Sequence, residues 1–307
     1  MLHQKDSEGL DTSSTTHTPF IIKFPDSETL FTKRAQRFTS LAATHSAKNT
    51  LLFLAHFCTI QQQSVKRFKD FSSALARFST ISTPFIDRSK ILELGFYESI
   101  VHDFLNNMST DILPIKQKEA LNIMRLQEDQ WRLWGSNILN CEIPPKQVGE
   151  YLFITGVLQI IYALAASQFN TQIIKIQQQN VCPACRGTHT ASIVVDKGSK
   201  EEGTRFCSCL YCGTLWHYPL LQCTFCESTQ SISPSNFNKS SGAIIVETCQ
   251  ICQRSCNQLD QHKNPSLDVF ADDIAYTLDH LSQSSLPLKL GAFNPFLAEY
   301  IVNAKNE

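Results

Sequence analysis

Eight of the twelve cysteines in this 307-residue chain fall into four Cys-x-x-Cys pairs in its C-terminal half. Two thiolates separated by two residues can both face inward from one tight turn, and a second such turn about 25 residues further on completes a tetrahedral site. The spacing therefore predicts two four-thiolate metal sites in tandem. The pairs are Cys182/Cys185, Cys209/Cys212, Cys223/Cys226 and Cys249/Cys252.

The four pairs also form a repeat. Cys182 and Cys209 lie 27 positions apart, Cys223 and Cys249 lie 26 apart, and the two units begin 41 positions apart. A unit of this size is too small to hold an apolar core and usually needs a metal ion or disulfides. The repeat predicts a duplicated β module. The first four cysteines would bind one ion, and the last four would bind the other.

The cysteine pattern suits more than one metal. Tetrahedral sulfur ligation suits iron, as in rubredoxin, and zinc, as in a zinc ribbon. A closed four-cysteine site is most often structural. Disulfide pairing is the competing interpretation, but the polar N-terminus contains no apolar secretory segment, and disulfides are uncommon in a reducing compartment.

The remaining cysteines and the nearby histidines are expected to play no part in binding the ions. Cys207 and Cys256 stand just outside the pairs and are expected to be spare, partly buried thiols, with a substitute ligand or a reactive thiol as the alternative. Two further cysteines are expected in the helical core, and three histidines are expected beside the metal sites or on the surface. These residues are Cys58, Cys141, His189, His217 and His262.

The rest of the sequence gives no sign of an enzyme. It contains no Gly-rich phosphate loop, no Ser/His/Asp signature and no specific pair of catalytic carboxylates. Asp272-Asp273 is expected on a solvated helix face or at a partner contact. Between Cys182 and Cys256, six Lys/Arg stand against five Asp/Glu, and a net charge of +1 argues against nucleic-acid binding.

The first 180 residues predict an all-α domain. Apolar residues recur at spacings of three and four in 29–43 and 51–76, with Lys33, Arg34 and Arg37 on the polar side of the first segment. Phe104, Leu105, Trp131 and Trp134 are expected in the core. Residues 151–166 are strongly apolar but shorter than the roughly 20 of a membrane span, so a buried core helix is expected. Further helices are expected near 90–106, 116–125, 128–139 and 146–168.

The C-terminal half predicts short strands and one helix. Strands are expected at 191–195, 214–218 and 243–247, polar loops at 196–203 and 231–242, and a helix at 267–281. The predicted domains are a polar tail (1–22), a helical domain (23–179), two metal modules (180–220 and 221–265) and a C-terminal helix with a tail (266–307). The predicted fold class is therefore α+β and multidomain.

These motifs together resemble the FdhE family of formate dehydrogenase accessory proteins. The likeness runs from about Phe24 to Leu297. It is most specific at Cys209-Leu-Tyr-Cys212, at Trp216-His217-Tyr218 and at Cys223-Thr-Phe-Cys226. Asp272-Asp273-Ile274, Asn294-Pro295-Phe296-Leu297 and the opening Arg34-Ala35-Gln36-Arg37 add to it.

The resemblance implies two rubredoxin-like modules that bind iron and a cytoplasmic, non-enzymatic factor. This factor would bind the catalytic subunit of respiratory formate dehydrogenase before export. Neither nucleic-acid binding nor membrane insertion is expected, and a homodimer is left open. The alternatives are an electron-transfer protein with rubredoxin-like iron and a zinc-ribbon module that binds another macromolecule.

Overall fold

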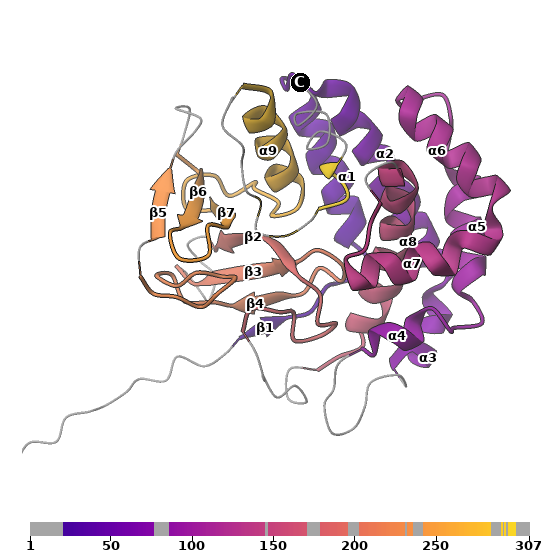
Figure 1. Cartoon of the computed structure of the whole chain (residues 1–307), viewed down its shortest axis with the longest axis horizontal. Coiled ribbons are helices and arrows are strands. Elements are labelled where there is room, and N and C mark those ends of the chain that lie inside the picture. Colours follow the sequence, from indigo (N-terminus) through magenta and orange to yellow (C-terminus); the bar gives the residue numbers. More distant parts are fainter. Residues whose placement is uncertain are drawn as a thin grey trace, which may run out of the picture.

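The computed structural model describes residues 21–76, 86–144, 147–170, 179–195, 203–230, 232–235, 242–283, 290, 292 and 294–298. Within them, a helical N-terminal region is followed by a region built on one sheet and by a C-terminal helix (Figure 1). This architecture confirms the predicted fold class. Residues 1–20 of the predicted tail, and residues 196–202, 231 and 236–241 of the predicted loops, lie outside the described residues.

The helical region contains eight α-helices and two 3-10 turns among the described residues. Amphipathic spacing places one face of each longer helix in a shared core, which includes Phe104, Leu105, Trp131 and Trp134 as predicted. The elements are α1 (Leu30–Ala42), α2 (Lys48–Arg67), η1 (Lys69–Phe71), α3 (Ser72–Ala76), α4 (Arg88–Ile91), α5 (Tyr97–Asn107), α6 (Ile115–Leu126), η2 (Glu128–Gln130), α7 (Trp131–Asn140) and α8 (Val148–Ala166).

Helix α8 forms the centre of this region. It packs against α2, α3, α5, α6 and α7. In the described part of the chain it is the one helix long and apolar enough to cross a membrane, and 89% of its most apolar stretch is buried inside the protein. A helix that is apolar on all sides is stable in water only when neighbours surround it. This burial agrees with the prediction of a core helix at 151–166.

The seven strands form one continuous sheet in the order β1-β4-β3-β2-β7-β6-β5. Each module contributes three antiparallel strands in the same spatial order, and parallel pairing of β2 with β7 joins the two modules edge to edge. The shared strand order is what a duplicated unit would give. The strands are β1 (Ile22–Lys23), β2 (His189–Val194), β3 (Arg205–Cys209), β4 (Leu215–His217), β5 (Ile232–Ser235), β6 (Ile244–Cys249) and β7 (Ser255–Asp260).

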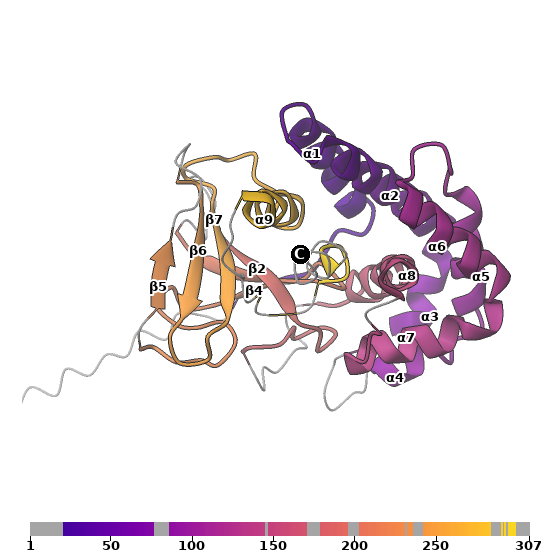
Figure 2. The same cartoon turned by 45° about the horizontal axis from the view of Figure 1, so that its top comes forward.

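Helix α9 (Ala271–Gln283) ties the sheet to the helical region and sits between β7 and α1 (Figure 2). Arg37 on α1 donates two hydrogen bonds, of 2.7 and 2.8 Å, to the Asp272 carboxylate. Asn257 on β7 donates a 2.7 Å hydrogen bond to Asp273. Both carboxylates are buried. The expectation that Asp272-Asp273 faces solvent is therefore wrong, because neighbouring helix positions here point toward two different packed elements.

Two further expectations are wrong for similar reasons. The sequence predicts Arg34 on the polar face of its helix, but it is only 2% exposed, and its guanidinium stacks on Phe270, just before α9, at 4.2 Å. The sequence predicts Cys141 in the core, but it is exposed. It follows the last residue of α7 in a left-handed conformation (φ 61°), which turns the chain away from the helix.

Candidate metal centres

The four Cys-x-x-Cys turns, here called knuckles, share one backbone geometry. In each, the N–H four residues after the first cysteine donates to that cysteine's carbonyl, as from Arg186 to Cys182 at 2.9 Å and from Gln253 to Cys249 at 2.8 Å. The residue after the second cysteine always has a positive φ, between 58° and 77°. This turn brings both side chains of a pair to the same side. The four residues with positive φ are Arg186, Gly213, Glu227 and Gln253.

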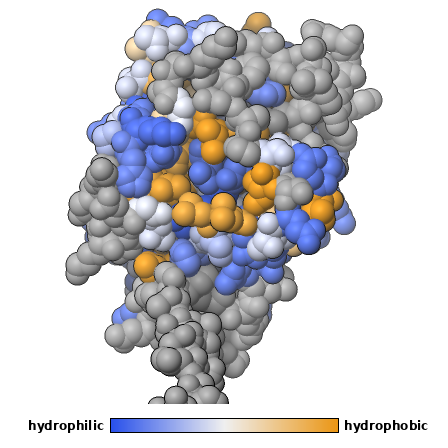
Figure 3. Space-filling view, turned by 90° about the vertical axis from the view of Figure 1, so that its left-hand side faces the viewer, coloured by the Kyte–Doolittle hydropathy of each residue, from blue (hydrophilic) through white to orange (hydrophobic). Residues whose placement is uncertain are grey.

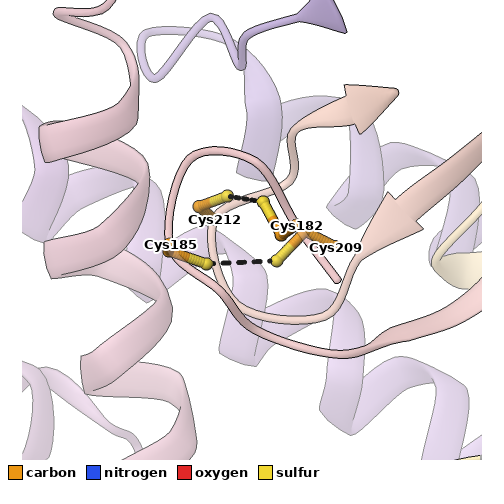
Figure 4. A group of neighbouring side chains, drawn as sticks. All are labelled: Cys182, Cys185, Cys209 and Cys212. Carbon is orange, nitrogen blue, oxygen red and sulfur yellow. Dashed lines mark hydrogen bonds between the residues drawn. The ribbon is translucent and has the colours of Figure 1, made fainter. Parts of the chain in front are cut away.

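The first two knuckles bring Cys182, Cys185, Cys209 and Cys212 together; this group is called site 1 (Figure 4). The Sγ atoms of Cys182 and Cys212 are 3.5 Å apart, and those of Cys185 and Cys209 are 3.4 Å apart. All four side chains are at most 1% exposed. They belong to the same apolar core as the helical region. Site 1 is thus an interior site.

The helical region contacts the knuckles of site 1 directly. Gln159 of α8 donates a 2.7 Å hydrogen bond to the carbonyl of Leu210, between the two cysteines of the second knuckle. Gln61 of α2 holds the Gln159 side chain through a 2.8 Å hydrogen bond. On the first knuckle, the Ile86 N–H donates to the Ala184 carbonyl at 2.8 Å. These buried polar contacts fix the position of site 1 relative to α2 and α8.

The last two knuckles bring Cys223, Cys226, Cys249 and Cys252 together; this group is called site 2. The Sγ atoms are 3.7 Å apart in both the Cys223–Cys252 and the Cys226–Cys249 pairs. Cys226 is exposed and Cys252 is half-buried. None of the four is part of either apolar core cluster formed by the described residues. Site 2 is thus a surface site with the same set of donor atoms.

Three apolar side chains close in sequence to the cysteines of site 2 are exposed. Leu220 and Leu221, just before Cys223, are 48% and 82% exposed, and Ile251, inside the last knuckle, is 59% exposed. Viewed from the β5 side, the molecule exposes hydrophobic groups among hydrophilic ones (Figure 3). Exposed apolar groups gathered on one surface are typical of a contact site for another molecule.

The electrostatic surroundings favour thiolates at one cysteine of each site. Burial raises the pKa of Cys249, but hydrogen bonds from the backbone N–H groups of Cys252 and Ile251 and from neighbouring thiols outweigh it and lower the pKa to about 7. At Cys209, burial is likewise outweighed by hydrogen bonds from the three other thiols of site 1, and the pKa lies well below its usual range. Burial raises the pKa of Cys182 and Cys212.

Both groups fit a single tetrahedral ion. Four sulfurs at about 2.3 Å from a zinc ion are about 3.8 Å from one another. The observed separations of 3.4 to 3.7 Å are close to that value. All twelve cysteines are free, so the disulfide interpretation is wrong. The structure thus groups the eight predicted cysteines as two sets that could hold two ions, and binding itself remains a prediction.

The other cysteines and histidines expected near the sites belong to neither set. Cys207 and Cys256 are buried on β3 and β7. His189 is fully buried, pairs with Cys209 across β2 and β3, and stacks on Phe225 with ring centroids 4.4 Å apart, so of the two predicted places it lies beside site 1 and away from the surface. His262 is close to Asp260, with Nδ1 at 3.1 Å from the carboxylate.

Two contacts between the modules could not be found from sequence spacing. Arg205 on β3, fully buried, donates a 2.5 Å hydrogen bond to Glu247 on β6, which is 13% exposed. Tyr218, just after β4, donates a 2.8 Å hydrogen bond to the carbonyl of Cys223. These contacts hold the two sites in a fixed relation.

The chain is similar to known proteins along its length. Models of the FdhE N-terminal, central and C-terminal domains match residues 19–179, 181–219 and 221–297. An FdhE homolog from Rhizobium meliloti (strain 1021) is 30% identical over 290 residues, which cover 92% of this chain and 94% of that protein. Another, from Shewanella sp. (strain MR-4), is 26% identical over 83% of each chain.

A solved structure shares the fold. The crystal structure of the FdhE protein from Pseudomonas aeruginosa matches with a TM-score of 0.67 at 20% identity. The match covers 85% of this chain and 92% of that chain.

Proposed function

Because this chain belongs to the FdhE family, we propose that it is an accessory factor in formate dehydrogenase biogenesis that catalyses no reaction of its own. The observation that supports this most is that the family match spans the helical region and both modules. Both cysteine sets lie within the residues that the family models match. The factor would therefore carry two metal sites on a sheet that the helices support.

The proposed partner is the catalytic subunit of formate dehydrogenase, bound in the cytoplasm before export. Site 2 and the exposed Leu220, Leu221 and Ile251 next to it offer a surface for such a contact. The proposed cofactors are two metal ions, one per site. Iron is favoured by the resemblance to rubredoxin-like modules, and zinc fits the same sulfur tetrahedron. A bound ion would cross-link segments distant in sequence.

A deletion strain tests this role. Loss of the gene should abolish formate dehydrogenase activity without abolishing synthesis of the catalytic subunit, and the wild-type gene should restore the activity. A tagged copy should co-purify that subunit from the cytoplasmic fraction. Full formate dehydrogenase activity in the deletion strain would contradict the proposal.

Electron transfer is the second candidate, and the exposure of Cys226 favours it. An iron ion at a surface site lies close enough to a partner to exchange an electron, whereas site 1 is surrounded by protein. Iron-loaded protein should then show a reversible change in visible absorbance with reductant. A colourless, redox-silent protein isolated from the native host would eliminate this candidate.

A further inference from the structure

Site 1 poses an electrostatic problem that site 2 does not. A divalent ion on four thiolates carries a net charge of −2, and a buried charge is strongly unfavourable unless opposite charge lies nearby. At site 2, water reaches Cys226 and Cys252 and can screen this charge. At site 1 all four sulfurs are buried, so protein groups must supply the compensation.

Arg34 of α1 approaches site 1 from the side of the second knuckle. Its Nη2 lies 3.4 Å from the point that a Cβ on Gly213, next to Cys212, would occupy. The side chain is 98% buried against Phe31 and Phe270. Its Nη1 has no hydrogen-bond acceptor within the described part of the chain. A buried cation with an unused donor is unfavourable unless negative charge lies nearby.

The groups around Arg34 that carry negative charge include the thiolates of site 1. Burial lowers its pKa, and Asp268, Cys58, Cys209 and Cys212 act in the opposite direction. The Asp268 carboxylate already accepts the N–H groups of Phe270 and Ala271 at 3.0 and 2.8 Å. The thiolates of the second knuckle are therefore a second source of negative charge for this guanidinium.

Arg88 of α4 approaches from the side of the first knuckle. A Cβ on Gly187 would lie 3.1 Å from the Cys185 Sγ and 3.2 Å from the Arg88 Nη1, so the guanidinium and the sulfur flank the same glycine. Arg88 also stacks over Tyr211 at 4.8 Å. Glycine leaves the space that the cation occupies, because any side chain at residue 187 would displace it.

We propose that Arg34 and Arg88 are charge-compensating residues of site 1, which stabilise its metal-thiolate dianion from two sides. The inference rests on the proposal above that site 1 binds a metal ion. Both arginines come from helices of the N-terminal region, whereas all four ligands come from the first module. The helical region would thus supply positive charge as well as packing. Of the possible oxidation states of a bound iron, the ferrous state carries the larger negative charge, so the arginines would favour it over the ferric state.

Metal affinity measured at site 1 tests the proposal. The full-length chain with Cys223→Ser and Cys226→Ser isolates site 1, and cobalt(II) binding is followed by its thiolate absorbance in competition with a chelator. Arg34→Met and Arg88→Met, which keep apolar bulk and remove charge, should each weaken cobalt binding about tenfold or more. Arg88→Lys, which keeps the charge, should recover most of the loss.

Iron provides an independent reading of the same charge effect. In the iron-loaded protein, each methionine variant should lower the midpoint potential of site 1, by about 59 mV for every tenfold change in the ratio of ferrous to ferric affinity. Arg254→Met, at an exposed arginine near site 2, should leave site 1 unchanged and is the matched control. If Arg34→Met does not fold, Arg88→Met and Arg88→Lys still decide the question.

The outcomes separate this inference from the one on which it rests. Wild-type site 1 that binds cobalt normally, with methionine variants of unchanged affinity and potential, would overturn the compensating role alone. A purely structural role would lower the stability of the metal-free and metal-loaded forms equally and leave the affinity unchanged. Wild-type protein that binds no metal at site 1 would overturn the metal proposal itself.

Discussion

Site 1 and site 2 have the same knuckles but different surroundings. Both sets of sulfurs have the separations expected for a tetrahedral ion, yet one set lies in the main core and the other lies at the surface. The knuckle turn determines which sulfur atoms can meet. The rest of the fold determines whether solvent and partner proteins can reach those sulfurs. A duplicated unit can therefore keep its donor atoms in two different surroundings: site 1 lies in the core, and site 2 lies at the surface, where we propose that the partner binds.

The two modules also differ in what supports them. The helical region contacts site 1 through Gln159 and the Leu210 carbonyl. The second module is supported by the pairing of β2 with β7, by the Arg205–Glu247 ion pair and by α9. Loss of each support should affect the two sites unequally.

Removal of the cysteines should have the largest effect. Structural zinc sites in small domains bind with apparent free energies of about 10–16 kcal/mol, comparable to the whole stability of a typical domain. Cys182→Ser with Cys185→Ser should therefore abolish the cooperative unfolding transition of the protein. Cys223→Ser with Cys226→Ser should leave the transition of the helical region and first module in place. Thermal unfolding followed by circular dichroism distinguishes the two, and equal losses would contradict an interior role specific to site 1.

The ion pair between the modules should have the next largest effect. Arg205→Met leaves the Glu247 carboxylate buried without its partner, which should lower the free energy of unfolding by about 3–5 kcal/mol. Replacing both residues by apolar ones should recover much of that loss, because no isolated charge remains. Chemical denaturation of the metal-loaded protein measures both. If the double variant loses as much free energy of unfolding as the two single variants together, the two residues do not act as a unit.

The pH should change the stability of the protein through Asp273 of α9, the helix that supports the second module. Burial raises the pKa of Asp273 to about 6, although hydrogen bonds from Asn257 and Thr190 partly oppose it. An unfolded aspartate has a pKa near 3.9. The folded protein then holds this proton more tightly than the unfolded chain, so this carboxyl makes stability fall as pH rises from about 4 to about 6, by up to about 3 kcal/mol.

Asp273→Asn removes the ionisable group at nearly constant size. The free energy of unfolding of the variant should not fall between about pH 4 and about pH 6, whereas the contribution of Asp273 makes that of the wild type fall. The variant should therefore become more stable relative to the wild type as the pH rises through this range. Denaturation at pH 4, 5, 6 and 7 measures it. Parallel pH profiles for the two proteins would show that Asp273 does not titrate in this window.

The backbone at the knuckles should give the smallest effects, of opposite sign in the two sites. Gly213 has φ +77°, and a Cβ there would lie 2.9 Å from the Leu30 Cδ2, so Gly213→Ala should cost about 1–2 kcal/mol. Glu227, which follows Cys226 of site 2 as Gly213 follows Cys212 of site 1, has φ 62°, so Glu227→Gly should stabilise by up to about 1 kcal/mol. Denaturant midpoints of the metal-loaded proteins test both, and shifts of the same sign would contradict this assignment of backbone strain.

The features predicted from sequence are those set by short spacings. Helical periodicity located α1 and α8, and the Cys-x-x-Cys pairs located the four turns whose sulfurs now lie together. The predicted strands at 191–195, 214–218 and 243–247 correspond to β2, β4 and β6, whereas β1, β3, β5 and β7 were missed. These are short or polar segments, and pairing with distant strands gives them their strand conformation.

The errors at charged residues have the same origin. Arg37 and Asp272 are 235 positions apart, and local patterning cannot show that they meet. Arg34, Asp272 and Asp273 look like surface residues by type, yet all three are buried. Asp272 pairs with Arg37 of α1, Asp273 accepts from Asn257 of β7, and Arg34 stacks on Phe270. A duplicated cysteine spacing likewise cannot reveal that only site 2 remains at the surface.

Metal release from the wild-type protein is the most direct test of unequal sites. The purified, reduced protein should carry two ions per chain, and a chelator in excess should remove one quickly and the other much more slowly. The variant with Cys223→Ser and Cys226→Ser, which keeps the core intact, should retain only the slow ion. Release of both ions at one rate, or a protein without tightly held metal, would contradict the account.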